Sequence, residues 1–340
     1  MTPTSTTPPR PAPRRRIWLR LAGSAIVLAI LLIAVPLDAL GAALSRVSPG
    51  VWAVLVIVYL GIHQIGVAKW RMLMRVTGAN LGHWYVTRCY LAGLFGNTFL
   101  PSVVGGDVIR TGLAIRKSNS AGTVLLASVV DRFVDVLGLG TVAGLGILLI
   151  PAALDEQSRH VFLVFCGLIA VVAATGAGVL LLVPARRVPW KVRRRLVGVR
   201  SSVRALTRAP GTVGLAWVLA VTLQSLLVVM TARLGHVMGI DVPLSVWMFA
   251  WPLAKISALV PLTQGGIGIR EAALVGLLAP FGVPAASALA VGLAFQGIIL
   301  TGGVVGGLIA FAPGASRVGW STLRAVAGGL TPPKATEHRT

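Results

Sequence analysis

The chain has 340 residues, of which 56% are hydrophobic and only 12% are charged. Because so few charges cannot cover the surface of a soluble protein of this size, the composition excludes a soluble globular protein and indicates a polytopic membrane protein. A formal net charge of +22 suggests nucleic acid in a soluble chain, but here the basic residues lie in short segments between apolar stretches, and we expect no nucleic-acid partner.

Apolar stretches long enough to cross a membrane follow one another along the chain. The first 16 residues are rich in Thr, Pro and Arg, which is typical of a disordered tail. Continuous apolar runs then occur at about 17–37, 51–70, 121–150, 161–183, 212–232 and 285–311. Arginines before the first run are also typical of a signal peptide, but the many later spans favour an uncleaved first helix.

Two further apolar regions, at about 84–116 and 244–281, are interrupted by proline, glycine and charged residues. Each region predicts two short helices joined by the interruption, because helix breaks are tolerated at membrane depth only inside protein or beside a cavity. We therefore predict an all-α polytopic membrane protein with about 8 spanning elements. Two of these elements are interrupted or re-entrant helical hairpins.

Basic residues between the spans predict the orientation of the chain. Lys69, Arg71 and Arg75 are expected on the cytoplasmic side, together with the basic linker 184–210. Segments with few basic residues are expected on the opposite side, namely 38–50, 151–160 and 233–243. With this alternation, both termini are cytoplasmic.

The domain organisation follows from these assignments. We expect a disordered cytoplasmic tail (1–16), a transmembrane domain (17–311) and a cytoplasmic C-terminal tail (312–340). The most basic part of the linker, residues 186–208, contains Trp190 as its single aromatic residue. That composition favours a loop lying on anionic lipid over an arm that binds nucleic acid.

One motif occurs twice, at a constant offset of 160 residues. Pro101 is followed four residues later by a glycine pair and nine residues later by Arg110, and Pro261 is followed in the same way by a glycine pair and Arg270. Helix-breaking residues beside charges, at matching places in two halves of a membrane protein, are typical of broken helices that meet at a midplane site. The alternative is a chance recurrence in a chain with 40 glycines.

The same offset relates the flanking segments, so we predict two repeat halves at about 51–150 and 211–311. The distribution of basic residues predicts that the first half begins on the outer side of the membrane and the second half on the cytoplasmic side. The two halves therefore form a repeat with inverted topology. Such an arrangement is typical of a transporter core rather than of a soluble enzyme.

Ionisable residues within the spans are the candidate site residues, since each costs about 3 kcal/mol to insert and should face protein or water. Asp107 and Arg110 share a helical face if the segment after Gly106 is helical, and can pair while the guanidinium still faces a cavity. Amides freed at the glycine break, with an arginine one turn later, form a natural anion site. Arg270 and Glu271 follow the second break in the same way.

Asp131, Arg132 and Asp135 form a third charged cluster, close to the centre of a span. Lys255 is a further intramembrane cation. Internal ion pairing that locks helices together is the alternative for all these charges, and Asn97 and Gln264 can either contact a polar head group or bridge helices. The residues assigned to substrate binding are Asn97, Pro101, Gly105, Gly106, Asp107, Arg110, Asp131, Arg132, Asp135, Gln264, Gly265, Gly266, Gly268, Arg270 and Glu271.

Other chemistries find little support in the sequence. The two cysteines and five histidines form no metal-ligand spacing, so neither a metal site nor a cofactor is expected. The stretch Gly265–Gly268 has no preceding strand and no following GK[ST], which argues against a nucleotide loop. No catalytic Ser/His/Asp or Cys/His arrangement is present, and we do not expect an enzyme.

At these residues the chain resembles the lysylphosphatidylglycerol synthase transmembrane region family, also called flippase-like domain proteins. The matching pieces are Asn97–Pro101, Gly105–Arg110, Asp131–Arg132 and Gly265–Gly268 with Glu271, and their order fits the family over about 17–311. The resemblance implies a bacterial inner-membrane protein related to the domain that flips aminoacylated phosphatidylglycerol, with other relatives in polyprenyl-linked sugar and cell-envelope pathways. Only about 29 residues follow Phe311, so the soluble aminoacyl-transferase domain, and hence synthase activity, is not expected.

The leading hypothesis is a flippase for an anionic or aminoacylated phospholipid or a polyprenyl-linked glycan, with Arg110 and Arg270 engaging the phosphate. A second hypothesis is a non-transporting accessory subunit that presents a lipid to a cell-envelope glycosyltransferase or synthase. A third, a membrane enzyme acting on a polyprenyl phosphate, is the weakest, because the chain has only nine Asp and Glu residues to supply a catalytic acidic cluster.

Overall fold

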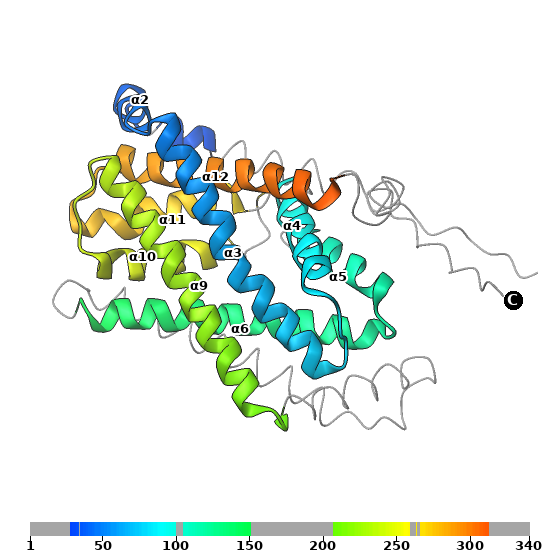
Figure 1. The fold of residues 1–340 in the computed structure, drawn as a ribbon. Coiled ribbons are helices and arrows are strands. Elements are labelled where there is room, and N and C mark those ends of the chain that lie inside the picture. The colour runs from blue at the N-terminus through cyan, green and yellow to red at the C-terminus, as the bar shows by residue number, and fades with distance from the viewer. Residues whose placement is uncertain are drawn as a thin grey trace, which may run out of the picture.

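The computed structural model describes residues 28–33, 35–99, 105–150, 207–258, 263 and 266–312. All regular structure within these ranges is helical, as the sequence predicts (Figure 1). The elements are α2 (Leu37–Ser45), α3 (Pro49–Thr77), α4 (His83–Phe99), α5 (Gly105–Lys117), α6 (Ala121–Leu148), α9 (Pro210–Val237), α10 (Leu244–Ser257), α11 (Ile269–Leu278), the 3₁₀ turn η3 (Ala279–Phe281) and α12 (Ala285–Phe311).

Three of these helices, α3, α9 and α12, are long and apolar enough to cross a membrane. They have 29, 28 and 27 residues, and at the helical rise each exceeds the thickness of the hydrocarbon core. Helix α6 is similarly long, with 28 residues, but carries three charged residues in its middle. The predicted run 161–183, the basic linker 184–210 up to residue 206 and most of the first run lie outside the described residues.

Each interrupted apolar region forms two short helices. The first consists of α4 and α5, and the second of α10 and α11. Helix α5 begins at Gly105, whereas α11 begins after Gly266 and Gly268, whose φ angles of 77° and 90° are in the left-handed region that favours glycine. The two breaks therefore differ in their local geometry, although they match in sequence spacing.

Two segments that the charge pattern assigned to a side of the membrane have features that the pattern did not predict. The segment 38–50, expected on the side opposite the cytoplasm, contains most of the helix α2, whose Leu40 and Ala43 form an apolar face buried against α12. Lys69, expected in a cytoplasmic segment, lies in the interior of α3 and is 1% exposed. The helix continues eight residues further, to Thr77, and carboxylates on α6 neutralise the buried ammonium group.

The four long helices form two pairs that run in opposite directions, and short helices pack along two of them. In Figure 1, α3 and α9 lie side by side and run in opposite directions. Helices α6 and α12 also run in opposite directions, but they lie apart, in the lower and the upper part of the view. The short helix α4 packs along α12, and α10 packs along α6. Each half of the chain thus packs its first short helix against the last long helix of the other half.

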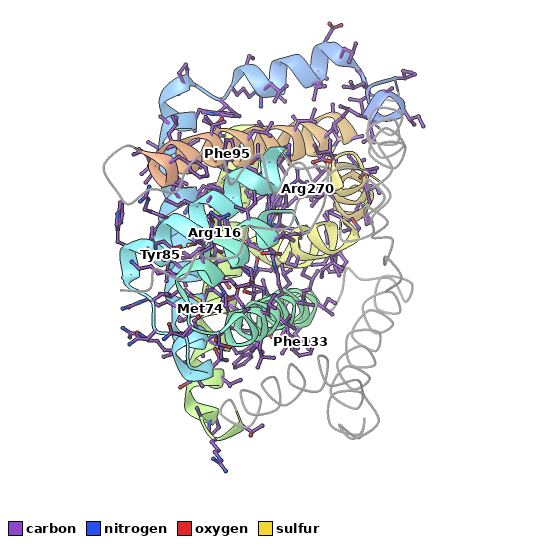
Figure 2. All side chains as sticks on the ribbon, turned by 90° about the vertical axis from the view of Figure 1, so that its right-hand side faces the viewer. Met74, Tyr85, Phe95, Arg116, Phe133 and Arg270 are labelled. Carbon is purple, nitrogen blue, oxygen red and sulfur yellow. The ribbon has the colours of Figure 1, made fainter. Side chains whose placement is uncertain are left out.

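Glycines on α12 allow this close packing. A Cβ atom added at Gly303 would clash with Thr98 of α4, and one at Gly307 would clash with Phe95. Phe95 lies against α12 in Figure 2. Its ring also meets that of Phe311 edge to face, at a centroid separation of 6.1 Å. Small residues at a helix–helix contact are the usual means of close approach in membranes.

Candidate functional site

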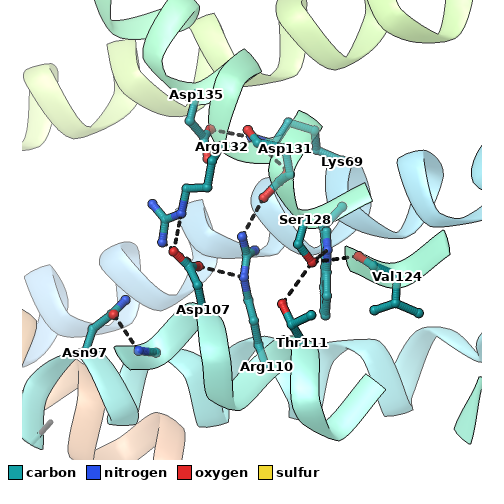
Figure 3. A network of polar contacts seen from close by, with 12 residues as sticks. Lys69, Asn97, Asp107, Arg110, Thr111, Val124, Ser128, Asp131, Arg132 and Asp135 are labelled. Carbon is teal, nitrogen blue, oxygen red and sulfur yellow. Dashed lines mark hydrogen bonds and ion pairs between the residues drawn. The ribbon is translucent and has the colours of Figure 1, made fainter. Parts of the chain in front are cut away.

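Six charged side chains from three helices form one connected cluster, here called the ion network (Figure 3). Its members are Lys69 on α3, Asp107 and Arg110 on α5, and Asp131, Arg132 and Asp135 on α6. Three cations face three carboxylates, so the network is neutral as a whole. A neutral, paired cluster is the form in which charges are tolerated inside a membrane protein.

Arg110 is at the centre of this network and is 4% exposed. Its Nη2 lies 2.9 Å from Oδ2 of Asp131, and its Nε lies 2.9 Å from Oδ1 of Asp107, three residues earlier on the same helix. The predicted pairing of Asp107 with Arg110 is therefore present. The guanidinium also lies 4.8 Å from the ring centroid of Trp70, which adds a cation–π contact.

The three charges on α6 pair with other helices rather than with one another. Lys69 Nζ lies 3.1 Å from Oδ1 of Asp131 and also pairs with Asp135. Arg132 binds Asp107 through two hydrogen bonds, from Nε at 2.5 Å and from Nη2 at 2.6 Å. Neighbouring residues on a helix point in different directions, so Asp131 and Arg132 cannot face the same partner.

Asn97 joins the two short helices of the first half. Its Oδ1 accepts a hydrogen bond from the Gly106 amide at 2.9 Å, which satisfies a free donor at the start of α5 (Figure 3). Gly105 and Gly106 are both buried, and a Cβ atom at Gly106 would clash with the carbonyl oxygen of Gly93. Gly106 therefore allows the close packing of α5 on α4.

The second half has a smaller charged pair. Arg270 and the fully buried Glu271 pair directly, with Arg270 Nε 3.0 Å from Glu271 Oε1. The other carboxylate oxygen accepts the Gly268 amide at 2.6 Å, so Glu271 also closes the start of α11. Arg270 Nη2 donates to Gln296 Oε1 of α12 at 3.0 Å, and Figure 2 shows Arg270 in the interior of the bundle.

A cavity of about 300 Å³ lies between the two halves. It is lined from α3, α4 and α6 of the first half and from α9, α10, α11 and α12 of the second. Its charged and amide lining residues are Asn97, Arg132, Asp135, Gln224, Lys255, Arg270 and Gln296. Its volume is at the small end of the range for ligand sites, enough for a polar head group but not for acyl chains.

The cavity separates the predicted site residues into two groups. Asn97, Arg132, Asp135 and Arg270 line it, whereas Arg110 is not among its lining residues. Among the other described residues of the predicted site, Asp107 pairs with Arg132 and Glu271 pairs with Arg270. The residues of the predicted site that are likewise absent from the lining are Gly105, Gly106, Asp107, Asp131, Gly266, Gly268 and Glu271. Pro101, Gln264 and Gly265 lie outside the described residues.

Several lining residues were not assigned to the site from the sequence. Lys255 is the most important, and its Nζ donates to Gln224 Oε1 of α9 at 3.0 Å. Trp251, one turn earlier on α10, lines the same cavity, as does His63 of α3. The sequence feature that could have identified Gln224 and Lys255 as site residues is the position of each polar side chain within an apolar run.

In the described part of the chain, no group of three or more His, Cys, Asp or Glu side chains is placed so that it could hold a metal ion. The charged and amide side chains that line the cavity supply hydrogen-bond donors and acceptors and fixed charges. Such groups bind and orient a polar ligand, and ionic groups held at membrane depth mark ligand or ion pathways.

Comparison with known proteins agrees with this architecture. The family model described as the lysylphosphatidylglycerol synthase TM region matches residues 17–307, which is most of the chain. Neither a curated protein nor a solved structure matches. The match includes every helix from α2 to α11 and most of α12, together with all the charged residues described above. The chain is thus a membrane protein that belongs to the lysylphosphatidylglycerol synthase transmembrane region family.

Proposed function

We propose that this protein is a lipid flippase, which moves a polar head group through the cavity between its two halves while the acyl chains stay in the membrane. The observation that carries the proposal is the cavity itself, about 300 Å³ in volume and lined by charged and amide side chains within a bundle of apolar helices. Ionisable groups are rare at membrane depth, and those that face a cavity mark substrate or ion pathways.

We propose further that the two halves form an inverted repeat that opens the cavity alternately to each side. Helices α3, α4, α5 and α6 have 29, 17, 13 and 28 residues, and α9, α10, α11 and α12 follow in the same order with 28, 14, 10 and 27. The opposite directions of α3 and α9 and the exchanged packing of α4 and α10 support a two-fold relation (Figure 1).

The substrate classes that we propose are an anionic or aminoacylated phospholipid or a polyprenyl-linked glycan, in the inner membrane of a bacterium. In this proposal both termini are cytoplasmic, residues 186–208 lie on anionic lipid, and no covalent bond is made or broken. Arg132 and Arg270 replace the pair Arg110 and Arg270 as the arginines that meet the head group, because both line the cavity.

Reconstitution into vesicles tests this function. Fluorescent phospholipid in the inner leaflet becomes accessible to an added quencher when it is translocated, so the rate of quenching measures transport. We expect Arg270→Ala to lower that rate about tenfold or more, through loss of charge-assisted hydrogen bonds. The matched control is Arg75→Ala, since Arg75 is exposed near the end of α3 and is not among the cavity's lining residues.

The alternative function, an accessory subunit, makes a different prediction in the same experiment. The wild-type protein would translocate no lipid, yet would retain bound lipid and co-purify with a cell-envelope glycosyltransferase or synthase. If wild type and Arg270→Ala transport lipid at equal rates, Arg270 is not part of the transport site.

A further inference from the structure

We infer that the cavity selects a lipid whose head group has a net negative charge and no amine, so that Lys255 pairs with a lipid phosphate and an aminoacylated head group is rejected. This inference deepens the proposed flippase function and narrows its substrate class. It rests on three features of the cavity: the net charge of the surrounding side chains, the ion pairs in which the carboxylates are already engaged, and the hydrogen-bond donors that remain available to a ligand.

Among the described residues, the charges around the cavity leave one cation without a carboxylate partner. The ion network and the pair Arg270–Glu271 contain four cations and four carboxylates, each within an ion pair. Lys255 is a fifth cation, and no carboxylate of the described residues lies within 4.0 Å of its ammonium group. Because Lys255 lines the cavity, one positive charge in excess faces the ligand.

The neutral contact of Lys255 holds the ammonium group in place without cancelling its charge. Gln224 is 3% exposed, and its Oε1 accepts one of the three ammonium protons at 3.0 Å. Two donors of Lys255 therefore stay available for another acceptor. A phosphate diester carries one negative charge and supplies acceptor oxygens, which matches both the charge and the donors.

A second donor on the same helix supports an acceptor-rich ligand. Trp251 lies four residues before Lys255, is 1% exposed and lines the cavity. Its indole Nε1 is buried and has no hydrogen-bond partner among the described residues. Because an indole N–H can only donate, a buried unpaired one is costly unless a ligand supplies the acceptor.

Few carboxylate oxygens around the cavity are left for an amine in the head group. Asp135 is the one carboxylate among the described lining residues, and its Oδ1 already pairs with Lys69. Glu271 is fully buried and is shared by Arg270 and the Gly268 amide. A cationic head group would therefore meet the excess charge of Lys255, while each described carboxylate near the cavity is already in an ion pair, and this like-charge contact weakens its binding.

Two of the aromatic rings that line the cavity already have a guanidinium over the ring, with Arg270 Cζ 5.6 Å from the Trp251 centroid and Arg110 Cζ 5.2 Å from that of Tyr90. A lipid ammonium group would have to compete with these internal cations.

The test measures binding and transport on the same preparation of the full chain. Native mass spectrometry compares the bound amounts of phosphatidylglycerol, lysyl-phosphatidylglycerol and phosphatidylcholine offered at equal concentration. We expect phosphatidylglycerol to be favoured over the lysyl form by about tenfold or more. Lys255→Gln should reduce that ratio about tenfold, whereas the matched control Lys117→Gln, an exposed position at the end of α5, should leave it unchanged.

Each outcome decides a different point. Equal or stronger binding of the lysyl form would overturn the inference, and so would an unchanged ratio in a folded Lys255→Gln protein. Selective binding of phosphatidylglycerol without transport would uphold the inference and reject the flippase function. Displacement of the lipid by glycerol 3-phosphate at similar concentration would show that a free phosphate ester is the ligand, and would overturn the assignment to lipid.

Discussion

Asp131 of α6 and Arg110 of α5 form a buried ion pair, with 2.9 Å between Oδ2 and Nη2 and with side chains that are 1% and 5% exposed. The second carboxylate oxygen of Asp131 lies 3.1 Å from Lys69 Nζ of α3. One carboxylate therefore joins three helices, two of which are far apart in sequence. A buried charge of this kind cannot be removed without leaving its partners uncompensated.

We expect Asp131→Asn to destabilise the protein by about 3–5 kcal/mol, because it leaves two buried cations with too little negative charge. The measurement is unfolding by denaturant in detergent, followed by circular dichroism. Asp38→Asn is the matched control, since Asp38 is exposed on α2 and forms no ion pair with the described residues. Equal stability of the two variants would contradict a structural role for the network.

Two glycines of α5 provide a paired test of helix packing. A Cβ atom at Gly106 would clash with Gly93 and Asn97, whereas one at Gly112 would have no heavy atom within 4 Å. We expect Gly106→Ala to cost about 1–3 kcal/mol through overpacking, and Gly112→Ala to be neutral or stabilising by up to about 1 kcal/mol. The readout is the midpoint of thermal unfolding. A harmless Gly106→Ala would show that α4 and α5 are less closely packed than described.

The pair Arg270–Glu271 can be tested by a double-mutant cycle. Glu271→Gln removes the charge that faces Arg270 and weakens the acceptor of the Gly268 amide, so we expect a loss of about 3 kcal/mol in the free energy of unfolding. Arg270→Gln with Glu271→Gln should recover part of this loss, since no charge is left buried alone. Additive losses in the double variant would mean that the two side chains do not interact.

The excess positive charge of the cavity can be measured chemically. A single cysteine introduced as Gln224→Cys, with Cys89 and Cys166 replaced by serine, would line the cavity beside Lys255. We expect a negatively charged methanethiosulfonate to modify it about tenfold faster than a positively charged one, because the local field attracts anions. The rates are normalised to Asp38→Cys, an exposed position. Faster modification by the cationic reagent would reverse the sign that we assign to the cavity.

Local sequence patterns predicted most of the helices. Apolar runs predicted α6 and α12 to within two residues and located α3 and α9, although they ended seven and five residues too early, and helix breakers predicted that 84–116 and 244–281 each contain two short helices. These features depend on the chain itself, since a helix satisfies its own backbone hydrogen bonds wherever it lies. The pairing of Asp107 with Arg110 was also predictable from spacing along the chain, because residues three apart share a helical face.

The partners of the remaining charges could not be predicted in this way. Arg132 pairs with Asp107, 25 residues earlier, rather than with its neighbours, and Lys69 pairs across to α6 instead of facing the cytoplasm. Lys255 and Gln224 meet only because α9 and α10 pack together. Which charges cancel, and which one is left to face a cavity, depends on distances between helices, and those distances are set by packing of the whole bundle rather than by spacing along the chain.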